Sequence, residues 1–341
     1  MKGDLMNYLV LAILLPFAFL FIWMIRKKIT VGIWSIKVFK SNSIVFKRPT
    51  ESLLKEPTLK ASDVSDVPAE FVADPFIIHH DCKLFMFFEI LDKSIGKGVI
   101  GLATSKDGEK WKYEKVVLKE NFHLSYPYVF KNNDNFYMIP ETSEAGKVLL
   151  YKASLFPFEW EVAHTLLHGN YVDSSIFQYE DKWWMLAAKS RKLHLFFSEE
   201  PEGEWIEHPK SPLISNNEHI TRPGGRVIVD NDLIFRYTQD CKPNYGSAIR
   251  VFKITHLTEE EYDEEEVNLI LCGTKNAKDW NRDGMHSIDQ LKVNNSEWLT
   301  VVDGHRLEHK NYFFWKMERI IAMRKKENRL TIKTATKSTN I

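Results

Sequence analysis

The sequence predicts an all-β protein, a five-bladed β-propeller preceded by one N-terminal transmembrane helix. Two observations predict the propeller: paired apolar strands recur five times at a period near 50 residues, and a polar residue opens each unit. An uncharged run at the N-terminus predicts the helix. We expect a membrane anchor at 1–30, a linker with room for a ring-closing strand at 31–68, the propeller at 69–325, and a polar tail at 326–341.

The N-terminal run, Tyr8–Ile25, has 18 uncharged residues and is followed at once by Arg26, Lys27 and Lys28. As a helix it rises about 27 Å, at the short end of what spans a bilayer. It lacks the short apolar core and small-residue cleavage site of a signal peptide, so we expect an uncleaved anchor. The basic residues behind the span predict a single-pass membrane protein with its body on the cytoplasmic side.

Charge and motifs exclude several function classes. Lys+Arg and Asp+Glu both total 46, so no net field attracts nucleic acid, and we expect no nucleic-acid partner. The three cysteines, Cys82, Cys241 and Cys272, have no metal-type spacing and form no disulfide framework. The sequence has no Gly-rich phosphate loop and no nucleophile elbow. We therefore predict no metal and no cofactor.

Each repeat begins with a strand that opens on a polar residue and turns into a second, more apolar strand. The first strands start at Asp74, Tyr126, Asp173, Arg222 and His286, which are 52, 47, 49 and 64 residues apart. The second strands are Leu84–Glu89, Phe136–Glu141, Trp183–Lys189, Leu233–Arg236 and Trp298–Asp303. An ordinary β-sandwich is the alternative, and hairpins in strict order at a fixed period disfavour it. The long fourth interval contains the acidic run Glu259–Glu266, which we interpret as a solvated insertion between blades.

The repeat predicts which residues share one face. In a propeller the first strand of each blade lines the central channel, and the second runs antiparallel beside it. The start of the first strand and the end of the second therefore lie together. This face collects Asp74, Tyr126, Asp173, Arg222, His286, Glu89, Glu141, Lys189 and Asp303. We expect these polar side chains to form the wall of a pocket.

Two carboxylates in this set suit glycosyl transfer, which needs a base for the attacking hydroxyl and commonly an acid for the leaving oxygen. Asp74 precedes a proline, which favours an extended start that holds the carboxylate at the channel rim. Asp173 opens blade three in a similar way. The alternative is that both residues only cap turns at the strand starts.

Several stretches carry a family resemblance: Ala73–Phe76, Thr104–Gly108, Ser125–Phe130, Ile139–Glu144, Val172–Phe177, Arg222–Arg226 and Gln239–Cys241. The first two and Asp173 resemble the five-bladed arabinanases, xylosidases, levansucrases and invertases. The others resemble more closely the N-terminal domain of the glucosamine inositolphosphorylceramide transferase family, over about residues 65–320. Plant members carry a separate glycosyltransferase domain, so the reaction of the propeller itself does not follow from the resemblance.

The hydrolase resemblance implies that Asp74 is the base and that Asp173 orients it or tunes a partner's pKa. Blade four of those hydrolases opens with the glutamic acid that protonates the leaving group, whereas this chain has Arg222. An arginine cannot deliver that proton near neutral pH. Glu141 or Glu89 could take the acid role instead. We therefore name Asp74, Asp173 and Glu141 as catalytic candidates.

The basic residues suggest a second interpretation, in which the pocket binds an anion. Guanidinium groups suit phosphate, and a sugar phosphate needs charge stabilisation of its leaving group rather than a proton. The predicted substrate-binding set is Glu89, Tyr126, Lys189, Arg222, Arg226, His286 and Asp289. Alternatively, the arginines form salt bridges with Asp173, Glu141 or Asp240 that support the blade junction.

Three functions remain open at this point. The leading hypothesis is glycosyl transfer or glycan-precursor modification for cell-envelope glycan or glycolipid synthesis at the membrane, with a nucleotide sugar or lipid phosphate as partner. The first alternative is a glycoside hydrolase of the arabinanase or invertase type. The second is a non-catalytic, glycan-binding module.

Overall fold

A computed structural model of the chain describes residues 2–45 and 54–338. Residues 46–53 of the expected linker, and 339–341 of the expected tail, lie outside the described residues. The chain divides into two compact units. One unit comprises Ile33–Asp92 and Lys97–Arg306, and the other comprises Met1–Gly32, Lys93–Gly96 and Leu307–Ile341.

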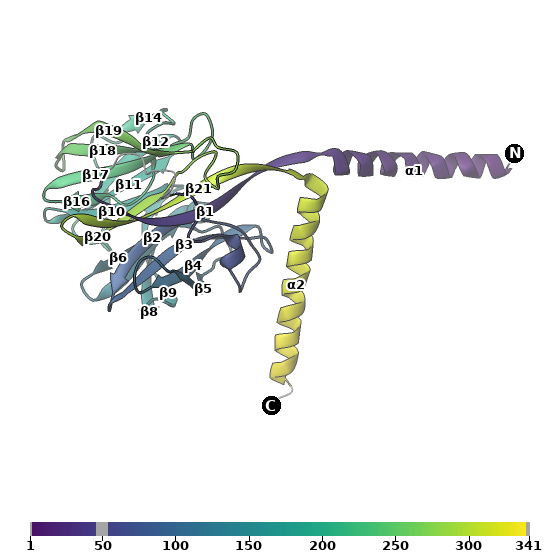
Figure 1. The fold of residues 1–341 in the computed structure, drawn as a ribbon, viewed down its shortest axis with the longest axis horizontal. Coiled ribbons are helices and arrows are strands. Elements are labelled where there is room, and N and C mark those ends of the chain that lie inside the picture. Colours follow the sequence, from purple (N-terminus) through teal and green to yellow (C-terminus); the bar gives the residue numbers. More distant parts are fainter. Residues whose placement is uncertain (1, 46–53, 339–341) are drawn as a thin grey trace. The chain divides into compact units, whose positions relative to one another are not determined.

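The larger unit is the predicted five-bladed propeller, with five separate antiparallel sheets (Figure 1). Blade one is β2 (Ala69–His80), β3 (Lys83–Asp92), β4 (Lys97–Ser105) and β5 (Lys112–Leu118). Blade two is β6 (Ser125–Asn132), β7 (Asn135–Glu141), β8 (Lys147–Leu155) and β9 (Glu159–His168). Blade three is β10 (Val172–Tyr179), β11 (Lys182–Lys189), β12 (Lys192–Ser198), β13 (Ile206–Glu207) and β14 (Ile214–Ser215). Blade four is β15 (Arg222–Pro223), β16 (Ile228–Asp230), β17 (Leu233–Asp240), β18 (Ala248–Leu257) and β19 (Tyr262–Cys272).

Blade five joins the two ends of the propeller sequence. Its strands are β20 (Ile288–Asn294), β21 (Glu297–Asn311) and β1 (Lys28–Ser41), in the order β1-β21-β20. Ser41 Oγ lies 2.7 Å from Thr300 Oγ1 at this junction, in a buried position. An N-terminal strand therefore completes the last sheet, which removes an open edge from the ring.

The repeat extends to single side chains at the blade turns. In three blades a tryptophan donates its indole N–H to a backbone carbonyl three or four residues earlier in the sequence. The pairs are Trp111 with Gly108 at 3.0 Å, Trp160 with Pro157 at 3.0 Å and Trp205 with Pro201 at 3.3 Å. The same aromatic residue thus closes the same turn in blades one, two and three.

The acidic run Glu259–Glu266 is not an insertion between blades, as the sequence suggested. From Tyr262 onward it belongs to β19, the outer strand of blade four, which pairs with β18. Exposed carboxylates on an outer strand discourage edge-to-edge pairing with other chains. Most side chains of β19 are exposed, so its sequence lacks the alternation of apolar and polar residues that marks a half-buried strand. The acidic run therefore resembles a loop in the sequence.

The smaller unit contains two helices, α1 (Lys2–Arg26) and α2 (Tyr312–Ser338). No helix in the described residues is both long and apolar enough to cross a membrane, so the predicted transmembrane helix is not supported by the structure. The side chains of residues 1–11, 13 and 18, within or before that expected span, lie outside the described residues. Helix α2 was not predicted, and it includes most of the expected polar tail.

Closure by β1 predicts that its core residues stabilise the whole propeller. Ile36 is fully buried in β1, and its backbone N–H donates to Leu59 O at 2.8 Å. Truncation of Ile36→Ala should lower the free energy of unfolding by about 2–5 kcal/mol, since it leaves a cavity in the core. Val229, 39% exposed on β16, is the matched control. Urea denaturation of both variants tests this, and equal, small losses would contradict closure by β1.

Candidate active site

The opening residues of blades one to three share an unusual backbone conformation. Asp74, Tyr126 and Asp173 have φ values of 51°, 46° and 53°. Each lies where the pairing of the first two strands shifts register, as in a β-bulge. A non-glycine residue with positive φ costs free energy, and bulges re-aim side chains near functional sites. The register shifts thus take the side chains of these three polar residues out of the regular up-and-down alternation of the sheet, at one end of the channel.

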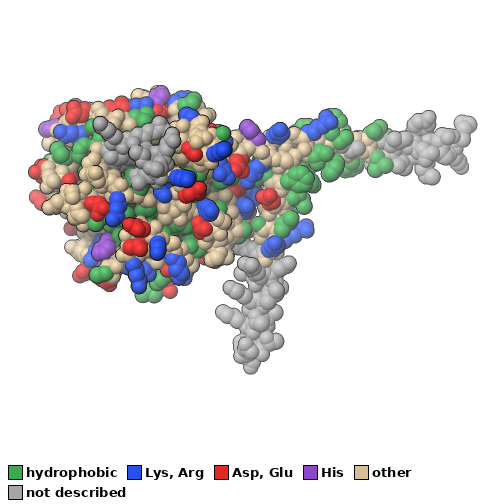
Figure 2. Space-filling model, in the orientation of Figure 1, with side chains coloured by type: hydrophobic (Ala, Val, Ile, Leu, Met, Phe, Trp, Pro, Cys, Tyr) green, Lys and Arg blue, Asp and Glu red, His purple; other side chains and the backbone are tan. Residues whose placement is uncertain are grey.

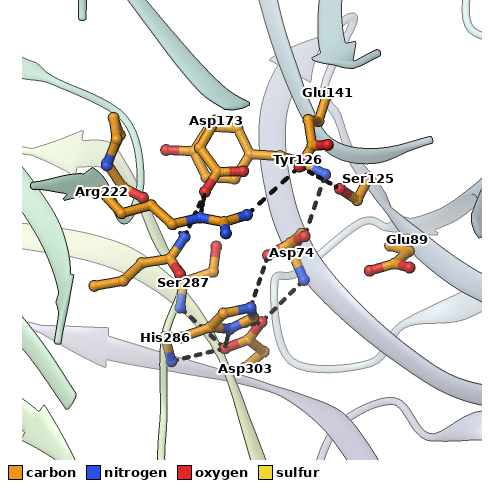
Figure 3. A network of polar contacts seen from close by, with 12 residues as sticks. Asp74, Glu89, Ser125, Tyr126, Glu141, Asp173, Arg222, His286, Ser287 and Asp303 are labelled. Carbon is orange, nitrogen blue, oxygen red and sulfur yellow. Dashed lines mark hydrogen bonds and ion pairs between the residues drawn. The ribbon is translucent and has the colours of Figure 1, made fainter. Parts of the chain in front are cut away.

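Asp74, His286 and Asp303 form a buried triad at this end (Figure 3). His286 Nδ1 lies 2.8 Å from the Asp303 carboxylate, and its Nε2 lies 3.5 Å from Asp74 Oδ1. Asp303 Oδ2 also accepts the backbone N–H of Asp74 at 3.0 Å. Imidazole and backbone therefore hold the two carboxylates on opposite sides of one ring.

Asp74 has the properties of a base that works near neutral pH. Its Oδ2 accepts the backbone N–H of Tyr126 at 3.2 Å, while its buried Oδ1 has no hydrogen-bond partner among the described residues. Burial raises the pKa of Asp74 to about 7, with His286 opposing that shift and Asp303 adding to it. Burial lowers the pKa of His286, but the charges of Asp303 and Asp74 outweigh burial and raise it. A carboxyl group with a pKa near 7 can both accept and release a proton at physiological pH.

Arg222 connects the other two catalytic candidates. Its Nε donates to Asp173 Oδ2, and its Nη2 lies 3.5 Å from Glu141 Oε2. Gln239 Nε2 also donates to Asp173 Oδ2, at 2.8 Å. Burial and the charge of Asp173 raise the pKa of Glu141, and Arg222 opposes this shift. Arg222 therefore forms the salt bridges of the alternative interpretation, with Asp173 and Glu141, while 29% of its side chain remains exposed.

Glu89 and Tyr126, two of the predicted substrate-binding residues, also lie at the mouth of the channel. Glu89 is buried, its Oε1 lies 3.3 Å from His123 Nε2, and burial together with Asp74 raises its pKa well above the ordinary value. Tyr126 is fully buried, and its hydroxyl lies 2.9 Å from Ser175 Oγ and donates to Gly225 O at 3.0 Å. Tyr126 thus ties blade two to blades three and four.

Arg226 and Asp289 lie apart from this cluster, as a buried ion pair. Arg226 Nε donates to Asp289 Oδ1 at 2.7 Å, and Nη2 donates to Asp289 Oδ2 at 3.1 Å. Arg226 Nη2 also donates to Val129 O at 3.0 Å, and Asp289 accepts the N–H of Ile77 at 2.7 Å. These contacts join four blades and leave Asp289 with no exposed side-chain surface. The structure does not bring this pair to the catalytic carboxylates.

A pocket of about 440 Å³ adjoins Arg222 between blades three and four. Its lining includes Lys189, Arg191, Arg222, Glu218 and Tyr245. Lys189 Nζ lies 4.6 Å from the centre of the Tyr171 ring, and the Arg222 guanidinium lies 5.2 Å from that of Tyr245. Because Glu218 already pairs with Arg191 at 3.1 Å, the pocket has a cationic wall formed by Lys189 and Arg222.

Sequence reasoning assigned no role to four residues that build this site: Asp303, Trp34, Gln239 and Tyr245. Asp303 was placed on the correct face by its position at the end of a second strand. Trp34 packs on His286 with ring centroids 4.1 Å apart, and it comes from β1, far from the blade pattern. Tyr245, 46% exposed, lies in the connection between β17 and β18, which is longer than the corresponding connections in blades one to three. Asp303 and Gln239, near the ends of second strands, carried a signal that the repeat could have revealed.

The triad also offers ligand atoms of a kind that metal ions use. One atom from each of Asp74, His286 and Asp303 lies within 4.8 Å of the others. The imidazole and Asp303 already share a hydrogen bond, so a metal ion would have to replace that contact. No sequence motif points to a metal, and the prediction of none stays a prediction.

Comparisons with known proteins place the fold and the family. The sequence profile described as "Glucosamine inositolphosphorylceramide transferase 1, N-terminal" matches residues 27–305. Glucosamine inositolphosphorylceramide transferase 1 of Oryza sativa subsp. japonica is 34% identical over 300 residues, which are 81% of this chain. The protein of that name from Arabidopsis thaliana is 34% identical over 306 residues, 83% of this chain. The matches span only 40% of the length of these relatives.

Solved structures are similar in fold at low sequence identity. An exo-1,5-α-L-arabinanase from a bovine ruminal metagenomic library has a TM-score of 0.50 and 15% identity, covering 70% of this chain and 92% of that protein. This likeness supports the propeller fold alone.

The raised pKa of Asp74 predicts a pH dependence of stability. Between its ordinary pKa of 3.8 and about 7, the folded protein keeps a proton that the unfolded chain has released. The folded state therefore binds more protons there, and stability falls as pH rises through this range. Asp74→Asn removes the titration. The free energy of unfolding of the variant relative to wild type should thus increase by about 1–3 kcal/mol from pH 5 to pH 8.

Urea denaturation at several pH values measures this difference. The exposed turn residue Asp181, changed to Asn, is the matched control because it leaves the buried cluster intact. Parallel pH curves for wild type and Asp74→Asn would contradict the assigned protonation.

Proposed function

The chain belongs to the family of the glucosamine inositolphosphorylceramide transferase N-terminal domain, and from this premise we propose that its propeller transfers a glycosyl group from a phosphate-activated sugar to a hydroxyl acceptor. The relatives' name contains a sugar, glucosamine, and a lipid that carries a phosphate, inositolphosphorylceramide. We take the acceptor to be a glycan precursor or glycolipid at a membrane surface.

One observation carries the proposal: a proton acceptor and a cationic wall lie at the same end of the channel. Asp74 Oδ1 is buried 3.5 Å from His286 Nε2 and has no hydrogen-bond partner among the described residues, and Arg222 and Lys189 line the adjoining pocket. Arginine and lysine bind phosphate oxygens through charge-assisted hydrogen bonds. A sugar phosphate and an attacking hydroxyl would thus meet groups of the required charge.

The proposed step balances as follows. The acceptor oxygen forms a bond to the anomeric carbon while the bond between that carbon and the phosphate oxygen breaks. The leaving electron pair stays on the phosphate, where Arg222 and Lys189 offset the added charge. The proton of the acceptor hydroxyl passes to the carboxylate of Asp74. Glu141 and Asp173 hold the guanidinium of Arg222 in place through the contacts described above.

Glycoside hydrolysis is a second candidate, and the state of Glu141 favours it. Burial and Asp173 raise the pKa of Glu141, as required of a carboxylic acid that protonates a leaving oxygen. In that reaction Asp74 would activate water instead of an acceptor hydroxyl. Neutral oligosaccharides would then be the substrates, and the cationic wall would have no role in their binding.

Lys189 provides the sharper test of phosphate recognition, because Arg222 also neutralises buried carboxylates. Lys189→Ala should weaken binding of UDP-N-acetylglucosamine by the full chain about 10-fold or more, the value of a charged hydrogen bond. Lys192→Ala, an exposed neighbour outside the pocket, is the matched control. Calorimetric titration of both variants, with neutral arabino- and xylo-oligosaccharides alongside, separates the candidates. Binding of neutral sugars that is indifferent to Lys189 would favour the hydrolase.

Turnover of the bound sugar tests the role of Asp74. Asp74→Asn should reduce transfer about 100-fold or more while binding persists, since only the proton acceptor is removed. Release of sugar from labelled UDP-N-acetylglucosamine, followed chromatographically with a lipid-phosphate acceptor, measures this rate. Binding without turnover in wild type would instead identify a glycan-binding module.

A further inference from the structure

Helix α2 begins with an aromatic and apolar face of large side chains, several of which are exposed. Phe313, Phe314, Met317, Ile320 and Ile321, here named the apolar face of α2, lie three or four residues from Met317. This spacing puts them on one side of a helix. Phe314, Met317 and Ile321 are 63%, 38% and 47% exposed. The face therefore presents large apolar side chains to its surroundings over more than two turns.

The residues around this face are basic. Lys316 and Lys325 lie on its two sides, Arg324 follows Ile321 by about one turn, and a single acidic residue, Glu318, lies between Tyr312 and Lys325. Arg319 lies on the opposite side of the helix, over the Trp315 ring, with its guanidinium 4.5 Å from the ring centre. An apolar face with basic residues at its sides and its end is typical of a helix that lies in the surface of an anionic bilayer.

The end of α1 meets the start of α2 with the same chemistry. Phe21 and Phe313 contact edge to face, with ring centroids 5.9 Å apart. The ammonium group of Lys27 lies 4.8 Å from the Trp23 ring centre and 4.5 Å from that of Tyr312. Figure 2 shows green apolar and blue basic side chains gathered in this region. Aromatic rings with interleaved basic groups mark the headgroup level of membranes.

The exposed apolar surface continues from α2 onto α1. Phe17, Phe19, Leu20, Phe21 and Trp23 are 66%, 73%, 50%, 53% and 49% exposed. A soluble protein seldom exposes so many contiguous large apolar side chains without a partner. Hydrophobic and basic groups together fit the acyl–headgroup boundary better than an uncharged protein groove.

We propose that α2 is a membrane-surface helix whose apolar face inserts into the headgroup region of an anionic lipid bilayer. Phe314, Met317 and Ile321 enter the lipid, and Lys316, Arg324 and Lys325 contact anionic headgroups. Insertion of such helices reaches about 5–10 Å into the boundary. The inference rests on the smaller unit alone and holds whichever sugar the propeller takes.

Fluorescent labels on the two sides of α2 test the inference in the full chain. With Cys82, Cys241 and Cys272 changed to Ser, the variants Ile321→Cys and Met323→Cys each carry one environment-sensitive label. Residues two positions apart in the sequence lie about 200° apart around a helix, so Met323 faces away from Ile321. Met323 is also exposed and is therefore the matched control. The chain is reconstituted into vesicles of phosphatidylglycerol with phosphatidylcholine, and of phosphatidylcholine alone.

We expect the label at position 321 to shift to the blue and to be quenched by nitroxide lipids at least about twofold more than that at position 323. The response should be strong only with phosphatidylglycerol. Each of Lys316→Gln, Arg324→Gln and Lys325→Gln should lower the ratio of docked to undocked helix about fivefold, whereas Glu318→Gln should not lower it.

Two results would overturn the proposal. One is the same water-like emission at positions 321 and 323 in anionic vesicles. The other is efficient disulfide formation between chains through Ile321→Cys in detergent without lipid, which would assign the face to a second copy of the chain.

Discussion

The carboxylate of Asp303 is the contact on which the channel mouth depends. It accepts the backbone N–H groups of His286, Ser287 and Asp74, and it lies 2.8 Å from His286 Nδ1. One buried carboxyl group from blade five thus fixes the backbone at the start of its own blade and at the start of blade one, where Asp74 has a positive φ. Because buried carboxylates cost free energy unless they are hydrogen-bonded, this degree of satisfaction explains how Asp303 can have no exposed surface. Asp74 Oδ2 in turn accepts the N–H of Tyr126, while its Oδ1 has no hydrogen-bond partner among the described residues and lies 3.5 Å from His286 Nε2.

Polar contacts occur at two levels along the channel: one consists of fully paired groups, and the other contains the catalytic candidates. At one level Arg226 and Asp289 are fully engaged with each other and with backbone groups of blades one and two. Replacing one member of such a pair would leave the other charge buried and unpaired, so both side chains are needed where the four blades meet. At the other level Asp74, Glu89 and Glu141 crowd together and their pKa values rise. Carboxyl groups whose pKa is raised by burial and neighbouring charge are typical of active sites.

The sequence allowed the fold and about half of the site to be predicted, for physical reasons that differ among residues. Asp74 and Asp173 open the first strands of blades one and three, and Glu141 ends the second strand of blade two, so the period brought them to one face. Arg226 and Asp289 lie only a few residues past blade openings, and periodicity cannot tell depth along a channel. Trp34 and Tyr245 come from a closing strand and an irregular loop, which lie outside the repeat. Helix α2 was missed because its basic residues resemble a solvated tail until the spacing of Phe314, Met317 and Ile321 is considered.

The proposed transfer from an anionic leaving group depends on the position of Arg222. Asp173 and Glu141 balance its charge on one side, while the exposed part of the guanidinium lines the pocket beside Lys189. A glutamic acid at that position would deliver one proton and then repel a departing phosphate. The arginine carries no transferable proton at neutral pH, yet it keeps a positive charge where negative charge develops. With Asp173 engaged by Arg222 and Gln239, the proposed transfer assigns proton acceptance to Asp74, whose Oδ1 has no hydrogen-bond partner among the described residues. In the proposed reaction, a guanidinium in place of an acid would therefore stabilise a leaving group instead of protonating it.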